Sequence, residues 1–215
     1  MPSFVPDISV LLAFAVAAFI LTITPGPDMA FQLSRAINYG RAHGIAAVFG
    51  GITGIFVHTS LAAFGISVLI VAAPPLFLAL KIVGAIYLIW LAWQAIRHGG
   101  GLRIAGPAKR RPSLRESFAM AMGTNLLNPK VVLFFVTFLP QFVTAGDPDA
   151  PGKLFFLGVE FIVVTLPFGI AMVFVAEGLV RAFTRSRWIE RAINWAFAGV
   201  FATFAAVILT AQARH

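Results

Sequence analysis

The chain has 215 residues, of which 60% are hydrophobic and only 11% are charged, with a formal net charge of +8. Soluble domains carry about 25% charged residues, so this composition excludes a soluble globular protein and predicts an integral membrane protein. The sequence contains no cysteine, which excludes disulfides and cysteine-ligated metal sites.

Six stretches are apolar and long enough to cross a bilayer, which requires about 20 mainly apolar residues as a helix. They predict an all-α, polytopic membrane protein with six transmembrane helices, in which residues 1–215 form a single transmembrane domain. The first stretch is expected to be retained, because no Lys or Arg precedes it as in a signal peptide. The predicted spans cover residues 8–23, 45–72, 77–96, 118–143, 154–179 and 193–210.

The first predicted span ends at a break, "TPGPD", at Thr24–Asp28. Proline removes a backbone donor and clashes with the preceding helical turn. Irregular backbone is tolerated at membrane depth only where it is buried in protein or lines a wet cavity. Two interpretations of Asp28 stay open: a functional carboxylate inside the membrane, or an N-cap of the next helix in a solvated loop.

The second predicted span contains "GGITG" at Gly50–Gly54, a G-x-x-x-G spacing that allows helices to approach closely. It predicts either packing within the bundle or the face of a homodimer. The same span carries a single imidazole, His58. A hydrogen-bonded core residue is the favoured interpretation of His58, and proton coupling is the alternative.

A basic loop is predicted at 97–117, where "GPAKRRPSLRES" is read as solvated. If six helices alternate in direction, the loops rich in Lys and Arg all fall on one side, which is expected to be the cytoplasm. Both termini are then expected outside. The positive charge therefore indicates membrane topology and attraction to anionic lipid, and no nucleic-acid partner is expected.

The fourth predicted span is interrupted at "NLLNPK", Asn125–Lys130. A charge at the bilayer centre costs about 2.5–3.5 kcal/mol on insertion scales, so Lys130 is expected to face a cavity or a partner and not to snorkel to an interface. Asn125 and Asn128 are expected either to satisfy broken backbone or to bind ligand. Glu160, in the fifth span, is expected to relay protons or to pair with Lys130.

The two breaks occupy matching places in two groups of three helices that enter the membrane from opposite sides. This pattern predicts a 3+3 inverted-topology repeat, which is common in secondary transporters. Freed N–H groups at a helix start favour an anion, and freed carbonyls at a helix end favour a cation. A zwitterionic amino acid needs both, so its carboxylate is expected at Lys130 and its ammonium at Asp28 or the carbonyls of "TPGP".

The predicted site follows from these breaks, with His58 and Glu160 as possible proton-coupling residues. The residues expected to bind substrate are Pro25, Gly26, Pro27, Asp28, Asn125, Asn128, Pro129 and Lys130.

The sequence predicts a transporter and not an enzyme, since it has no G-x-S-x-G, H-E-x-x-H, P-loop or G-x-G-x-x-G motif. No cofactor and no metal site are expected. One alternative is a carrier for a metal cation or another small ion, which the scattered carboxylates disfavour. Another is a non-transporting membrane scaffold, which would leave the two interior breaks without a purpose.

Three segments, "ITPGPDMAF", "GRAHGIAAVFGGITG" and "NLLNPKVVLFFVTFLPQFV", resemble the LysE/RhtB family of amino-acid exporters, and the resemblance covers essentially the whole chain. It implies a bacterial inner-membrane carrier that expels amino acids, driven by a proton or ion gradient. The "TPGP" and "NPK" regions are the family's hallmark segments. The substrate is left open, because members export basic, small neutral, branched or sulfur-containing amino acids.

Overall fold

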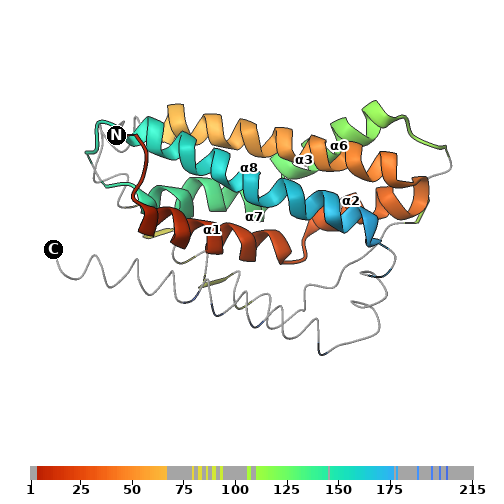
Figure 1. Ribbon diagram of the computed structural model, residues 1–215, viewed down its shortest axis with the longest axis horizontal. Coiled ribbons are helices and arrows are strands. Elements are labelled where there is room, and N and C mark those ends of the chain that lie inside the picture. Colours follow the sequence, from red (N-terminus) through yellow and green to blue (C-terminus); the bar gives the residue numbers. More distant parts are fainter. Residues whose placement is uncertain are drawn as a thin grey trace.

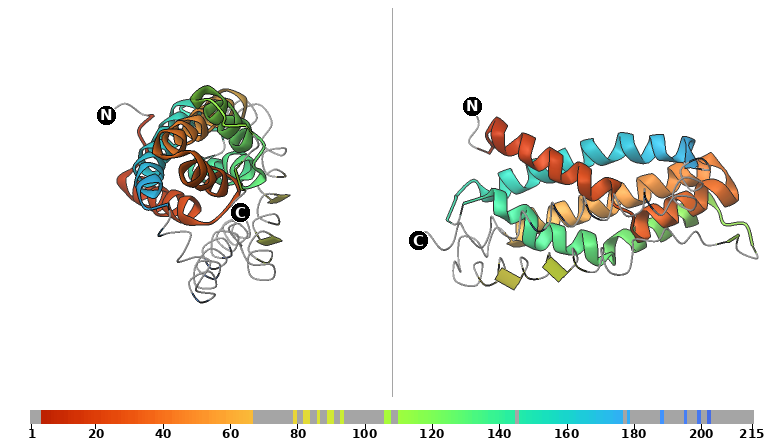
Figure 2. Two further views of the ribbon diagram at one scale, coloured as in Figure 1. Left: turned by 90° about the vertical axis from the view of Figure 1, so that its right-hand side faces the viewer. Right: turned by 90° about the horizontal axis from the view of Figure 1, so that it is seen from below.

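The computed structural model describes residues 4–66, 110–144 and 146–176, together with isolated positions elsewhere. In these three segments the regular elements are all helices, which confirms the all-α prediction. Viewed end-on, the helices run side by side along one axis (Figure 2).

The first predicted span forms a bent helix pair. Helix α1 covers Ile8–Ile23, as predicted, and α2 covers Pro27–Tyr39, at 55° to α1. Helix α2 begins with proline at its first position, where a missing N–H costs nothing because that group has no partner inside the helix. Helix α2 stops at Gly40, whose φ of 96° is readily adopted only by glycine.

The fourth predicted span forms the second bent pair. Helix α6 covers Leu114–Leu126, and α7 covers Pro129–Leu133. The chain continues as a π-helix, η2, at Phe134–Phe138 and a 3₁₀-helix, η3, at Leu139–Phe142, with a 51° bend at the break. The two bent pairs run in opposite directions along the bundle (Figure 1).

Helix α6 begins before the predicted residue 118, inside the stretch that was read as a solvated loop. The cause is a capping box: Ser113 Oγ accepts from the backbone N–H of Glu116 at 3.1 Å, and Glu116 Oε2 accepts from the backbone N–H of Ser113 at 2.6 Å. This reciprocal pair satisfies two backbone donors at the helix start.

Two unbroken helices complete the described bundle. Helix α3 covers Arg41–Leu61 and continues as a π-helix, η1, at Ala62–Ile66, and α8 covers Ala150–Phe174. Both are long and apolar enough to cross a membrane, and each bent pair counts as one further candidate span, which gives up to four within the described residues. The predicted spans at 77–96 and 193–210 and most of the loop at 97–117 lie outside the described residues.

Helix α3 packs against α2, α6 and α8. A Cβ atom added to Gly50 would lie 2.2 Å from the Phe118 carbonyl oxygen, and one added to Gly54 would lie 2.5 Å from Asn125 Oδ1. Any side chain at these positions would force α3 and α6 apart. The G-x-x-x-G spacing therefore serves packing inside the bundle.

The core consists of two hydrophobic clusters. The larger one is rich in phenylalanine, and the smaller one joins α2, α3 and α8. Phenylalanine-cluster members include Phe14, Phe134, Phe135, Phe138 and Phe161. The smaller cluster includes Met29, Leu33, Val48, Met172 and Val173. Leu21 and Val131, beside the two breaks, belong to the larger cluster, and Met29, just after the first break, belongs to the smaller one.

Candidate substrate site

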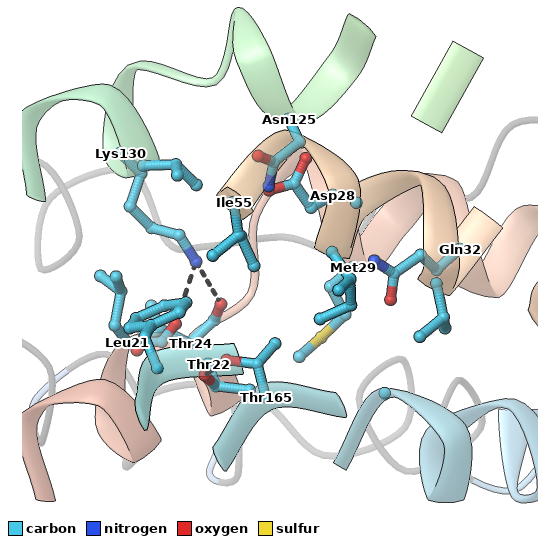
Figure 3. Close-up of a pocket in the computed structure, with 16 residues that line it drawn as sticks. Leu21, Thr22, Thr24, Asp28, Met29, Gln32, Ile55, Asn125, Lys130 and Thr165 are labelled. Carbon is cyan, nitrogen blue, oxygen red and sulfur yellow. Dashed lines mark hydrogen bonds between the residues drawn. The ribbon is translucent and has the colours of Figure 1, made fainter. Parts of the chain in front are cut away.

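A cavity of about 60 Å³ lies between the two helix breaks (Figure 3). It has polar groups from both breaks and an aliphatic and aromatic wall from α3, α7 and α8. Its lining residues include Thr22, Asp28, Gln32, Ile55, Asn125, Lys130, Phe161 and Thr165. Of the eight residues predicted to bind substrate, Asp28, Asn125 and Lys130 line the cavity, whereas Pro25, Gly26, Pro27, Asn128 and Pro129 shape the breaks around it.

Lys130 caps the end of α1 from the other half of the chain. Its ammonium donates to the Leu21 carbonyl at 3.1 Å and to the Thr24 carbonyl at 2.9 Å, as Figure 3 shows. A helical carbonyl normally accepts from the N–H four residues on, and for Leu21 that residue is Pro25, which has no N–H. The lysine thus replaces the missing donor at the negative end of the helix dipole.

Asp28 is the second residue of α2, and Gly26 is the N-cap, so the expectation that Asp28 caps this helix is wrong. Its Oδ2 accepts hydrogen bonds of 2.9 Å from Nδ2 of both Asn125 and Asn128. Its Oδ1 is buried and has no hydrogen-bond partner. These contacts exclude a solvated loop carboxylate, and the first turn of α2 places the negative charge near the positive end of a helix dipole.

The second break has a cap of its own. Asn128 is the N-cap of α7, and its Oδ1 accepts from the backbone N–H of Lys130 at 3.1 Å. Pro129 deprives the Asn125 carbonyl of its usual donor, and the Asn128 N–H supplies one at 3.0 Å. The asparagines therefore satisfy broken backbone, one of their two expected roles, and also hold Asp28.

The two breaks brace each other crosswise. Lys130 joins the start of α7 to the end of α1, and Asp28 joins the start of α2 to the end of α6. Within the described segments the ion pairs are Arg110–Glu116 and Lys153–Asp147, so Asp28 and Lys130 do not form one. Ile55 projects between them (Figure 3). The site holds a carboxylate and an ammonium that do not neutralise each other directly.

Neither His58 nor Glu160 takes part in the hydrogen bonds that join the two breaks. His58 is buried, its Nε2 is 3.5 Å from the Asn125 carbonyl oxygen, and its ring stacks on Phe135. The predicted pair between Glu160 and Lys130 is wrong. Glu160 Oε2 is buried and finds no hydrogen-bond partner, because α8 turns Phe161 and Thr165 toward the cavity.

Three polar residues of the cavity wall were not predicted from the sequence. Gln32 follows Asp28 by one helical turn, a spacing that places both on one face of α2. The hydroxyls of Thr22 and Thr165 lie 2.9 Å apart and join α1 to α8. The spacing of Gln32 was a usable signal, whereas the meeting of Thr22 with Thr165 depends on tertiary packing.

The site does not have the ligand set of a metal centre. Among the described residues no three His, Asp or Glu side chains are grouped so that they could hold a metal ion.

Known proteins resemble the chain along most of its length. A homoserine/homoserine lactone efflux protein of Salmonella typhimurium is 30% identical over 208 residues, covering 94% of this chain and 96% of that protein. A leucine efflux protein of Klebsiella pneumoniae is 30% identical with 94% and 95% coverage. An uncharacterized membrane protein of Vibrio cholerae is 28% identical with 96% and 100% coverage.

No solved structure matches the chain. The profile of the LysE type translocator family matches residues 19–212. The resemblance found in the sequence is thereby confirmed, and the chain is placed among multi-pass membrane transporters and not enzymes. It belongs to the family of LysE type translocators.

Proposed function

We propose that this translocator exports amino acids from the cytoplasm across the bacterial inner membrane, as a secondary transporter driven by a proton or ion gradient. The efflux of homoserine and leucine named for its relatives supports this direction and this substrate class. The basic stretch before α6 supports the orientation, with both termini outside the cytoplasm.

One observation carries the proposal: Asp28 and Lys130 line the same cavity with opposite charges and no ion pair between them. A zwitterion complements this arrangement. The substrate ammonium binds Asp28, whose Oδ1 has no partner, and the substrate carboxylate binds Lys130. Among the "TPGP" carbonyls, which were the alternative partners for the ammonium, that of Thr24 accepts from Lys130, as does the Leu21 carbonyl before them.

The structure is interpreted as a contracted state. A volume of about 60 Å³ accommodates a few water molecules, whereas pockets for small organic ligands measure about 300–1,000 Å³. Substrate must therefore separate the braced breaks to bind. The contacts of the substrate with Asp28 and Lys130 replace the hydrogen bonds that these residues make between the two breaks. Binding is thereby coupled to movement of one half against the other.

We extend this to alternating access by a 3+3 inverted repeat, in which one three-helix half rocks against the other around the site. The opposite directions and similar bends of the two helix pairs support this arrangement. Glu160 and His58 remain the candidates for proton coupling. Glu160 is favoured because its buried Oε2 has no partner that would hold its charge state fixed.

The test is excretion from cells that overproduce the protein. Such cells, challenged with dipeptides, should grow where the empty-vector control is inhibited, and one external amino-acid pool should rise. A metal carrier or a scaffold would change neither growth nor that pool.

Two variants tie excretion to the site. Lys130→Ala and Asp28→Asn should each abolish export while the protein still inserts in the membrane, which immunoblotting of membrane fractions checks. Wild-type efflux by either variant would remove that residue from the mechanism.

A further inference from the structure

A second buried cation lies on α2, beyond the central cavity. Only 8% of the surface of Arg35 is exposed. Its guanidinium carbon lies 4.6 Å from the centre of the Phe31 ring and 5.3 Å from that of Tyr39. Its Nη2 is 3.3 Å from the sulfur of Met120 on α6.

Within the described segments, no anion pairs with the positive charge of Arg35. Buried charges in proteins are normally paired, because removing them from water is costly. A thioether sulfur is a weak acceptor, and aromatic rings stabilise a cation only modestly. Neither ion pair of the described segments includes Arg35. This environment favours a carboxylate as a further partner.

The position of Arg35 relates it to the transport site. Asp28, Gln32 and Arg35 follow one another at helical spacing along one side of α2, and the first two line the cavity. Arg35 lies about 10 Å beyond Asp28 along the helix, at a rise of 1.5 Å per residue. It lies toward the end of the bundle that the proposed orientation assigns to the cytoplasm.

The Gln32 amide lies close to two glycines on this route. A Cβ atom added to Gly51 of α3 would lie 3.1 Å from Gln32 Nε2, and one added to Gly169 of α8 would lie 3.9 Å from Gln32 Oε1. The absence of side chains at Gly51 and Gly169 lets the amide lie against α3 and α8, and this amide is what separates Arg35 from the cavity.

We propose that Arg35 is a second carboxylate-binding residue, which receives the substrate on the cytoplasmic side before Lys130 does. This inference rests on the proposed function and adds a loading subsite to it. The substrate carboxylate displaces the Met120 sulfur from Arg35, passes Gln32, and reaches Lys130 while the ammonium reaches Asp28. Displacing so weak a partner leaves no strong acceptor unsatisfied.

Neighbouring contacts explain why the subsite is closed in this state. Arg111 Nη2 donates to the Tyr39 carbonyl at 3.2 Å, and His43 Nδ1 lies 3.0 Å from Ser117 Oγ. Together with the contact between Arg35 and Met120, they join α2 and α3 to α6 and the segment before it. Parting of the halves at this end breaks all three contacts and exposes Arg35.

The test compares Arg35→Met with Arg35→Lys. Met keeps an apolar side chain against the two rings and the sulfur, whereas Lys keeps the charge. Right-side-out and inside-out membrane vesicles give the half-saturating amino-acid concentration separately on each face. We expect Arg35→Met to raise it about tenfold on the cytoplasmic face, as for the loss of a charge-assisted hydrogen bond, with little change on the outer face. Arg35→Lys should restore much of the affinity.

A second measurement separates recognition from packing. The decarboxylated amine of the substrate should compete weakly with it at the cytoplasmic face of the wild type, and this discrimination should shrink in Arg35→Met. Equal changes on both faces, an affinity of Arg35→Lys no better than that of Arg35→Met, or no change in either variant would overturn the proposal. If the wild type moves no amino acid in either vesicle, the proposed function fails together with it.

Discussion

The two helix breaks bend the chain by similar angles, 55° between α1 and α2 and 51° between α6 and the segment Pro129–Phe142, which begins with α7. Each second helix begins with a proline at its first position. In each break, a proline also removes the donor of the carbonyl four residues earlier, that of Leu21 in the first and that of Asn125 in the second. In both halves, therefore, one backbone carbonyl lacks its usual helical donor.

The breaks differ in how this problem is solved. The second break is capped locally, because Asn128 caps α7 and its N–H satisfies the Asn125 carbonyl. The first break has glycine as N-cap with no side-chain bond, and its open carbonyls accept from Lys130 of the other half. The first break therefore depends on the second. A cap supplied from the other half of the chain is lost when the two halves separate.

The largest effect on stability is expected for Lys130→Ala. It leaves two buried carbonyls without a donor, each worth about 1–3 kcal/mol. Asp28→Asn, the matched control, is isosteric and keeps an oxygen that accepts from the asparagines. The stability lost in this variant should therefore be clearly smaller. Thermal unfolding of the two purified variants in detergent measures the difference. Equal losses of stability in the two variants would contradict the claim that the first break depends on Lys130.

Pro25→Ala should impair export more than Pro129→Ala. Alanine at 25 returns an N–H to the Leu21 carbonyl, which then competes with Lys130 and lets α1 continue. We expect a fall of about tenfold in the initial efflux rate, equivalent to about 1.4 kcal/mol. Alanine at 129 adds a donor to a carbonyl that already has one, so the rate should change little. A larger fall in the efflux rate for Pro129→Ala than for Pro25→Ala would show that the second break depends more on its proline than the first.

The backbone of the site was predictable, because it follows from local chemistry. Pro25 ends α1 at the predicted residue, and the break before Lys130 is where the sequence placed it. The early start of α6 was also predictable, because the spacing of Ser113 and Glu116 is that of a capping box. It was missed because the surrounding basic residues were interpreted as a solvated loop.

The pairings across the site were not predictable, because they depend on the phase and register of helices far apart in the chain. Phe161 and Thr165 line the cavity, and a residue one position before Phe161 points about 100° away on a helix with 3.6 residues per turn. That rotation removes Glu160 from Lys130. The hydrogen bonds from Asn125 and Asn128 to Asp28 likewise depend on how α2 and α6 meet.

A smaller contrast is expected between the two asparagines of the second break. Asn128→Ala removes both a helix cap, worth about 1 kcal/mol, and one hydrogen bond to Asp28. Asn125→Ala removes only the other hydrogen bond to Asp28. Export and thermal stability should therefore fall further in Asn128→Ala, as measured by efflux and unfolding on the same preparations. If Asn125→Ala were the more damaging, the local cap would not be what stabilises this break.

The smallest effect is expected for Asp147→Asn, in the loop between η3 and α8. Lys153 Nζ donates to Asp147 Oδ2 at 2.5 Å, and this hydrogen bond holds the pKa of the Asp147 carboxyl below its usual value. A carboxyl with a lowered pKa in the folded protein stabilises it above the ordinary pKa, and this contribution is lost as the pH falls through the lowered value. Asp147→Asn should therefore be slightly less stable than the wild type at neutral pH, by at most about 1 kcal/mol, and the gap should close in acid.

Export by Asp147→Asn should stay close to that of the wild type, since this pair joins a loop to the start of α8 and does not link the two breaks. The initial efflux rate checks this. A large loss of export would mean that transport depends on charged contacts in general and not particularly on those of the breaks. Near-normal export by Asp147→Asn, together with the expected loss of export in Asp28→Asn, would show that a carboxylate matters to transport where it holds one break to the other.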